Sequence, residues 1–207
     1  MDLPSLEAPH PSASALLDAA ARGDDDNVRR LLAEGVPVDI SDTEGSTPLL
    51  LATAGNHLGV AQQLIEAGAD VNRQNQRLDS AYLLAGASGH LAILRLTLAH
   101  GADLRSTNRY GGTALIPACE RGHIDTVRTL LQAGVDPNHI NNLGWTGLLE
   151  AILLSDGGPA HQAIVELLLD GGANPSLADG DGITPLQHAR QRGQQVIVAR
   201  LQAAGAH

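Results

Sequence analysis

Six glycines recur at an almost constant spacing, and this regularity constrains the fold more than any other feature of the chain. Each follows an apolar, helix-like run such as VRTLLQAG, and neighbouring glycines are 33 residues apart except for one interval of 38. A glycine just past a helix adopts the left-handed conformation without a Cβ clash. Six such helix ends predict six copies of one unit in a stacked repeat architecture. The glycines are Gly35, Gly68, Gly101, Gly134, Gly172 and Gly205.

A second series of residues predicts where each unit begins. Thr47, Ser80, Thr113, Thr146 and Thr184 precede apolar runs such as TPLLLA, and Ser14 in SALLDA is the first member of the series. Serine or threonine before an apolar run is typical of a helix N-cap, and proline suits the first helical position. Each unit is therefore predicted to contain two short helices joined by a turn.

The segments between units predict tight, hairpin-like fingers. DTEG, NRYG and NNLG have Asp or Asn first and Gly fourth, a pattern typical of type I turns. Leu78 takes the place of the glycine in NQRL, so we expect that finger to differ in shape.

The unit resembles the ankyrin repeat, in its 33-residue period and in its T-P-L-H-x-A phrase. TPLLLATAGNHLGVAQQLIEAGADVN follows the family pattern almost throughout, and the resemblance covers roughly residues 12–205. It implies an all-α solenoid of about six units in a single domain. The predicted division is a disordered leader at 1–11, an N-terminal cap at 12–43, units at 44–76, 77–109, 110–142 and 143–180, and a C-terminal cap at 181–207.

The fifth unit carries five extra residues around SDGGP. We expect the segment 155–160 to form a solvent-exposed loop, away from the fingers. Surface loops generally tolerate such insertions.

Composition excludes several classes of protein. The net charge is −10, all 13 basic residues are arginine, and no basic stripe is large enough to follow a nucleic-acid backbone. The arginine, alanine and glycine bias suggests a bacterial source. The N-terminus has no signal-peptide pattern, and no apolar run is long enough to span a membrane. The single cysteine, Cys119, is expected in the core and fits a reducing compartment. We expect a cytoplasmic protein that is monomeric by itself.

The histidines and carboxylates do not form a recognisable catalytic motif. His57, His90, His123 and His161 share one position of the unit, so they lie too far apart to bind one metal ion and are expected to cap helices. No zinc, nucleophile-elbow or phosphate-loop motif is present, and no cofactor is predicted. The alternative to a binding protein is a hydrolase or metal enzyme, with a site in the concavity near Glu150, His188 and Asp181.

The resemblance implies that this protein binds another protein, as an adaptor, a regulator or an inhibitor. The fifth position of the first-helix phrase is expected to face the concave side, where Leu51, Leu84 and Pro117 would form an apolar stripe next to Glu150. Exposed apolar surface usually marks an interaction site. Alternatively, these leucines pack between adjacent helices.

The fingers contribute the second part of the predicted site. Two of the three aromatic residues, Tyr110 and Trp145, fall in adjacent fingers, whereas Tyr82 is expected in the core. Tryptophan, tyrosine and arginine dominate interface hot spots. Trp145 has a structural alternative, in which its ring lies flat on the next finger. The remaining predicted finger contacts are Arg77, Arg109 and Leu143.

Overall fold

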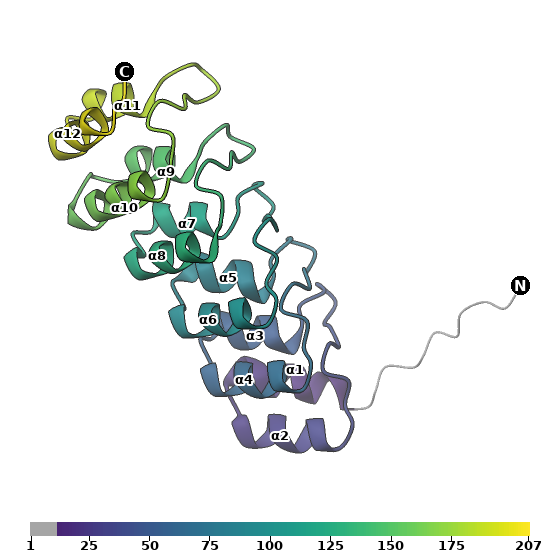
Figure 1. Cartoon of the computed structure of the whole chain (residues 1–207). Helices are drawn as coiled ribbons and strands as arrows, with labels where there is room; N and C mark the ends of the chain where they lie inside the picture. Colours follow the sequence, from purple (N-terminus) through teal and green to yellow (C-terminus); the bar gives the residue numbers. More distant parts are fainter. Residues whose placement is uncertain (1–11) are drawn as a thin grey trace, which may run out of the picture.

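The computed structural model describes residues 12–207, which form twelve α-helices (Figure 1). The predicted leader at 1–11 lies outside this described part of the chain. The helices are α1 (Ala13–Arg22), α2 (Asp25–Ala33), α3 (Pro48–Ala54), α4 (Leu58–Glu66), α5 (Ala81–Ser88), α6 (Leu91–Ala99), α7 (Leu115–Glu120), α8 (Ile124–Ala133), α9 (Gly147–Leu153), α10 (Pro159–Asp170), α11 (Pro185–Gln191) and α12 (Gln195–Ala203).

The helices form successive pairs that stack in two layers. The odd-numbered helices contact one another in order along one layer, and the even-numbered helices do so along the other. The segments between pairs project as fingers along one edge of the stack (Figure 1). Each predicted unit range holds one helix pair, and residues 12–207 contain no β-strand. The predicted all-α solenoid of stacked helix pairs is confirmed. No helix in this range has the length and apolar character needed to cross a bilayer.

The apolar core is continuous from one end of the stack to the other. Leu16 in the first unit and Leu201 in the last belong to the same cluster of buried side chains. Each helix pair therefore buries its apolar face on its neighbours, as expected for a solenoid. Tyr82 and Cys119 are fully buried in this cluster, as the sequence predicts.

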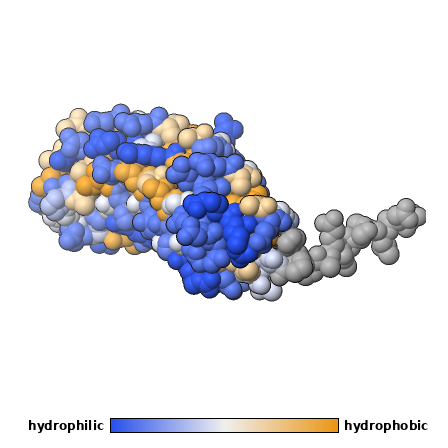
Figure 2. All heavy atoms as spheres, turned by 90° about the horizontal axis from the view of Figure 1, so that it is seen from below, coloured by the Kyte–Doolittle hydropathy of each residue, from blue (hydrophilic) through white to orange (hydrophobic). Residues whose placement is uncertain are grey.

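The free end of the first unit is polar, which keeps a terminal unit soluble. Arg29 pairs with Asp26 on α2 at 3.0 Å, and Arg30 pairs with Glu34, just past the end of α2, at 2.6 Å. All four side chains are largely exposed. Figure 2 views the stack from the end that carries α2 and shows mainly hydrophilic atoms in the foreground.

Hydroxyl side chains begin the first helices of most units. Thr47 Oγ1 accepts a hydrogen bond from Leu50 N at 3.2 Å, which satisfies one of the free N–H groups at the start of α3. Ser80, Thr146 and Thr184 cap α5, α9 and α11 in the same way. The prediction is wrong for Ser14, because α1 begins at Ala13 and Ser14 lies inside it. Alanines flank this serine, and their high helix propensity extends the helix past it.

The prediction of a cap is also wrong for Thr113, and Pro117 explains the difference. In α3, α5, α9 and α11, the backbone N–H of the residue four positions after the N-cap residue donates to the carbonyl oxygen of the N-cap residue. Pro117 has no N–H at that position. Ile116 N therefore bonds to Thr113 O at 3.3 Å, and Thr113 Oγ1 is buried without a partner. As a result, α7 begins one residue later, at Leu115.

The recurring glycines end the second helices as predicted. Gly134 has a φ of 93° and its N–H bonds to the carbonyl oxygen of Leu131 at 3.0 Å. The other five glycines of the series also have positive φ angles. This conformation is close to free for glycine and strained for other residues.

The first side chain of each finger organises its turn. Asn75 Oδ1 accepts hydrogen bonds from Arg77 N at 2.9 Å and Asp79 N at 3.0 Å. Matching bonds occur in the fingers that begin at Asp42, Asn108, Asn141 and Asp179. The expectation that Leu78 changes the shape of its finger is wrong. Its φ is 59°, and its N–H donates to Asn75 O at 2.9 Å. Leu78 therefore adopts the left-handed backbone conformation that glycine has in the other fingers.

The extra residues of the fifth unit pack against the last unit. They follow α9 at the end remote from its finger, in agreement with the predicted location. Gln194 Nε2, at the start of α12, donates to the carbonyl oxygens of Ile152 at 3.0 Å and Ser155 at 3.3 Å. Gly157 is buried against the Gln194 side chain, so the expectation of a solvent-exposed loop over 155–160 is wrong at its centre. The insertion therefore supplies one of the two acceptors of a polar side chain buried between two units, and α9 supplies the other.

Candidate protein-binding surface

Three adjacent cavities follow the first helices and fingers of the four middle units. The first two share Asp79 and Leu84, and the second and third share Tyr110 and Pro117, so together they form one groove, here called the central groove. The structure brings all the predicted site residues except Trp145 into the lining of this groove. These residues are Leu51, Arg77, Leu84, Arg109, Tyr110, Pro117, Leu143 and Glu150.

The finger tips change in character along the groove. The third finger position is occupied in turn by Glu44, Arg77, Tyr110, Leu143 and Asp181. Tyr110 is 55% exposed and Leu143 is 60% exposed, although both are large and apolar. The middle of the finger edge is therefore apolar, and charged tips flank it on both sides.

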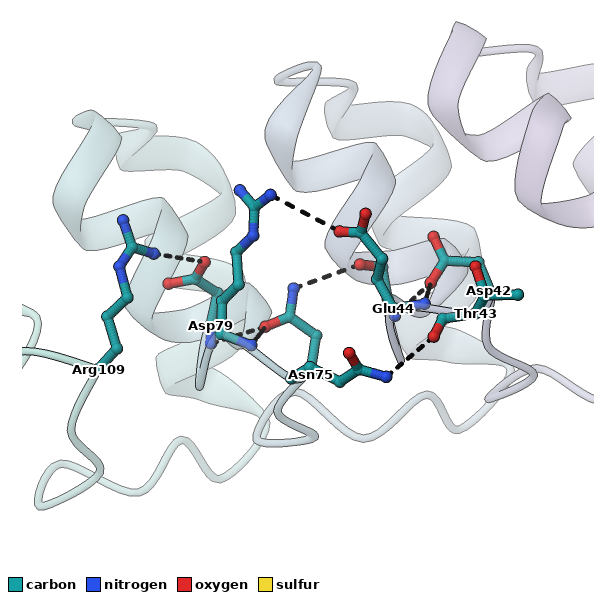
Figure 3. A network of polar contacts seen from close by, with 9 residues as sticks. Asp42, Thr43, Glu44, Asn75, Asp79 and Arg109 are labelled. Carbon is teal, nitrogen blue, oxygen red and sulfur yellow. Dashed lines mark hydrogen bonds and ion pairs between the residues drawn. The ribbon is translucent and has the colours of Figure 1, made fainter.

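Arginine side chains connect neighbouring fingers next to this apolar pair. Arg77 lies 3.8 Å from Glu44, and Arg109 lies 3.6 Å from Asp79 (Figure 3). The Arg109 guanidinium also lies over the ring of Tyr110, 4.6 Å from its centroid. Exposed ion pairs of this kind contribute little stability. Their effect here is to direct Arg109 toward Asp79 and across one face of the tyrosine.

The predicted concave stripe is only partly exposed. Leu51 and Leu84 are half-buried, whereas Pro117 and Glu150 are buried. The expectation that Pro117 and Glu150 are open to solvent is therefore wrong. Asn141, in the finger that leads into the fifth unit, lies against Glu150 and covers it, with Asn141 Nδ2 2.7 Å from Glu150 Oε1. Both buried residues still line the floor of the central groove.

Trp145 is half-buried at the base of its finger and does not line the central groove. Its N–H donates to Asn141 Oδ1 at 3.0 Å, and its carbonyl accepts from Asn141 N at 2.9 Å, so its backbone closes the turn. Its role in binding stays a prediction.

Glu150 has the most distinctive electrostatic environment in the groove. Burial raises the pKa of this carboxyl to about 7, and the negative charge of Glu120 acts in the same direction. The hydrogen bond from Asn141 opposes the shift because it favours the charged form. The carboxyl group of Glu150 is therefore costly to ionise unless a cation approaches it.

The residues of the alternative enzyme site are bonded separately. Glu150 bonds to Asn141, while His188 Nε2, in the next unit, lies 2.7 Å from Asp179 Oδ2. The bond from His188 helps to hold the pKa of Asp179 below its usual range. Asp181 is exposed and only its backbone N–H reaches Asp179, at 3.0 Å. Within residues 12–207, no three His, Cys, Asp or Glu side chains are grouped as metal ligands.

The histidine column joins neighbouring units. His57, His90 and His123 occupy the N-cap positions of α4, α6 and α8, but their side chains do not cap these helices. Instead, His57 Nε2 lies 3.1 Å from the carbonyl oxygen of Ala21, near the end of α1 in the preceding unit. His161 Nε2 makes the same kind of contact with Glu120 O at 2.9 Å. The predicted structural role therefore applies to a different helix end.

Several residues that line the groove are outside the predicted set, and Glu120 and Leu154 are two of them. Both line the last cavity of the groove: Glu120 comes three residues after Pro117, and Leu154 comes four residues after Glu150. Residues three and four apart lie on the same face of a helix. Both residues extend the predicted stripe by about one helical turn.

Comparison with known proteins gives consistent matches over most of the chain. A family model for ankyrin repeats in three copies matches residues 6–76 and 81–179. The putative ankyrin repeat protein YahD of Escherichia coli K12 is 59% identical over 58 residues, which are 28% of this chain and 29% of that protein. The chain thus matches less than a third of the length of that curated relative.

Solved structures match over a greater length. A crystal structure of an ankyrin repeat domain from Acinetobacter baumannii AYE is 59% identical, with a TM-score of 0.91, and the match covers 93% of this chain and 98% of that domain. A second crystallised ankyrin repeat protein is 44% identical, with a TM-score of 0.88, over 92% of this chain and 97% of the other.

Proposed function

Because the chain belongs to the ankyrin-repeat family, whose repeats generally mediate protein–protein interaction, we propose that it is a non-enzymatic module that binds another protein. The partner contacts the fingers and the central groove of the middle units, and the protein acts as an adaptor, a regulator or an inhibitor. The protein acts in the cytoplasm, is a monomer when unbound, and takes no cofactor, nucleic acid or membrane as its ligand.

The observation that carries this proposal is the exposed pair Tyr110 and Leu143 at the tips of neighbouring fingers. Asn142 N, in the finger of Leu143, bonds to Tyr110 O at 2.9 Å, so the two tips are held side by side. Large apolar side chains left exposed beside a groove are typical of interaction surfaces, and tyrosine is enriched among hot spots. One partner surface of about 800 Å² would cover both.

Affinity capture from the native cell extract, followed by mass spectrometry, tests the proposal. Leu143→Ser should reduce capture of the partner, and Tyr110→Ala, at about 2 kcal/mol for a hot spot, should reduce it about thirtyfold. Leu58→Ser is the matched control, because Leu58 is also an exposed leucine, at 42%, but lies on a second helix away from the groove. If all three variants capture the same proteins as the wild type does, the proposed surface is wrong.

Trp145 is tested in the same experiment. Because it is half-buried and outside the groove lining, Trp145→Ala should reduce capture less than Tyr110→Ala does and should also lower the melting temperature. A loss of capture at an unchanged melting temperature would instead make Trp145 the main contact. A broad hydrolase screen addresses the enzyme alternative, which would require metal-dependent turnover that Glu150→Ala abolishes.

A further inference from the structure

The last cavity of the central groove has the composition of a site for a cationic side chain. It lies between α7 and α9 and the fingers in front of them, and its volume is about 340 Å³. This is near the lower end of the range for ligand pockets, so it suits a single side chain better than a large ligand. Its walls combine Glu120 and Glu150 with the apolar surfaces of Tyr110, Leu143 and Leu154.

The two carboxylates have no cationic partner among residues 12–207. Glu150 is only 6% exposed, and its Oε1 accepts a hydrogen bond from Asn141 Nδ2. No described residue bonds to its second oxygen, Oε2. A buried carboxylate that lines a cavity with one unbonded oxygen is a strong acceptor for an incoming donor.

The arginines that line the same cavity are bonded elsewhere. Arg121 Nη1 donates to the carbonyl oxygen of Ala87 at 2.8 Å, which lies in the preceding unit. Arg109 pairs with Asp79 (Figure 3), and its guanidinium lies over the ring of Tyr110. Neither guanidinium therefore forms an ion pair with Glu120 or Glu150, although both line the cavity. No cation is among the causes that set the pKa of Glu150, which is raised.

We propose that this cavity receives an arginine side chain from an extended, basic segment of the partner protein, with its guanidinium against Glu150 and Glu120. The inference rests on the proposed function, and it adds the chemistry of the segment that is bound. A guanidinium is planar and donates in a fork that matches carboxylate oxygens. Its methylene stem would lie along the apolar walls formed by Leu143 and Leu154.

The probe for this proposal is N-acetyl-arginine amide, titrated into the full-length, isotope-labelled protein at pH 8 and followed by NMR. N-acetyl-citrulline amide is the matched probe, because it has nearly the same shape without the charge. The arginine compound should cause saturable shift changes confined to Tyr110, Glu120, Leu143 and Glu150. The citrulline compound should bind about tenfold more weakly or worse, since a hydrogen bond to a charged group contributes more than a neutral one.

One variant and its matched control test whether Glu150 binds the guanidinium. Glu150→Gln should weaken binding of the arginine compound about tenfold or more. Glu66→Gln should leave it unchanged, because Glu66 is an exposed carboxylate on α4 and its removal changes the net charge equally. Equal binding of both compounds, equal binding to wild type and Glu150→Gln, or shift changes spread over the acidic surface would each overturn the proposal.

The titration and the capture experiment test the two proposals separately. If Tyr110→Ala abolishes capture but the arginine compound does not bind the cavity, the protein-binding function stands and the basic segment is wrong. If the compound binds as expected but no protein is captured, the cavity is a guanidinium site and the proposed function is wrong.

Discussion

Replacing Glu150 with glutamine should stabilise the protein at high pH. The carboxyl is buried, its pKa is raised to about 7 from an ordinary value of 4.5, and Glu120 repels its charge. Glutamine has nearly the same shape and presents an oxygen that can accept the hydrogen bond from Asn141. The substitution therefore removes the cost of the charge while it keeps the neutral contacts.

The sign of the effect follows from the protons bound in each state. Between about pH 4.5 and pH 7 the folded protein holds a proton on Glu150 that the unfolded chain has released. The free energy of unfolding therefore falls as the pH rises through this window, and it levels off above pH 7. At about 1.4 kcal/mol per pKa unit, the ionised carboxylate costs the folded state roughly 1–3 kcal/mol, and the lower figure allows for screening by solvent in the cavity.

Urea unfolding of both proteins at pH 4.5 and pH 8 measures this effect, with far-UV circular dichroism and Trp145 fluorescence as probes. The stability difference between Glu150→Gln and wild type should grow by roughly 1–3 kcal/mol from the lower to the higher pH. The exposed Glu66→Gln exchange should change by less than about 0.5 kcal/mol over the same range. A difference that is the same at both pH values for Glu150→Gln would show that the carboxylate is not destabilised by burial, and would refute the reasoning.

Three backbone positions give further predictions. Gly134→Val should lower the free energy of unfolding by more than about 1 kcal/mol; the space around Gly134 is open, so the loss would come from its φ of 93°, and an unchanged urea midpoint would contradict the left-handed assignment. Leu78→Gly should raise stability by up to about 1 kcal/mol, because it relieves a leucine at positive φ, and a lower melting temperature would show that packing of this side chain outweighs the strain. Gly157→Ala should destabilise the last unit, because a Cβ there would lie 2.7 Å from Gln194 Cγ; hydrogen exchange in α12 should accelerate, and unchanged protection would indicate that the loop moves freely.

The extent to which the sequence predicts this structure differs between local and tertiary features. The period of the glycines and the hydroxyl caps predicts the units, because each of these signals acts within a few residues of its own helix end. The exceptions have identifiable causes. Thr113 fails as a cap because Pro117 lacks an N–H, and Leu78 keeps the shape of its finger because the hydrogen bonds of Asn75 outweigh the strain of its own backbone.

The candidate site shows the same division. The sequence alone was enough to identify the aromatic and arginine residues of the fingers, because their position in the repeat fixes which edge of the stack they occupy. It did not show that Trp145 lies outside the groove lining, that Glu150 is buried beneath Asn141, or that Glu120 faces the same cavity.

By itself, the sequence determined the repeat architecture, the number of units and the edge that carries the fingers, since a fixed period repeats the same local geometry. Only the tertiary structure decided how exposed each groove residue is and which partners its polar atoms find. Burial and charge neutralisation depend on side chains from adjacent units, and the 33-residue period sets which positions face each other without setting their chemistry. The unneutralised carboxylate of Glu150 is a property of that neighbourhood, and no single repeat contains it.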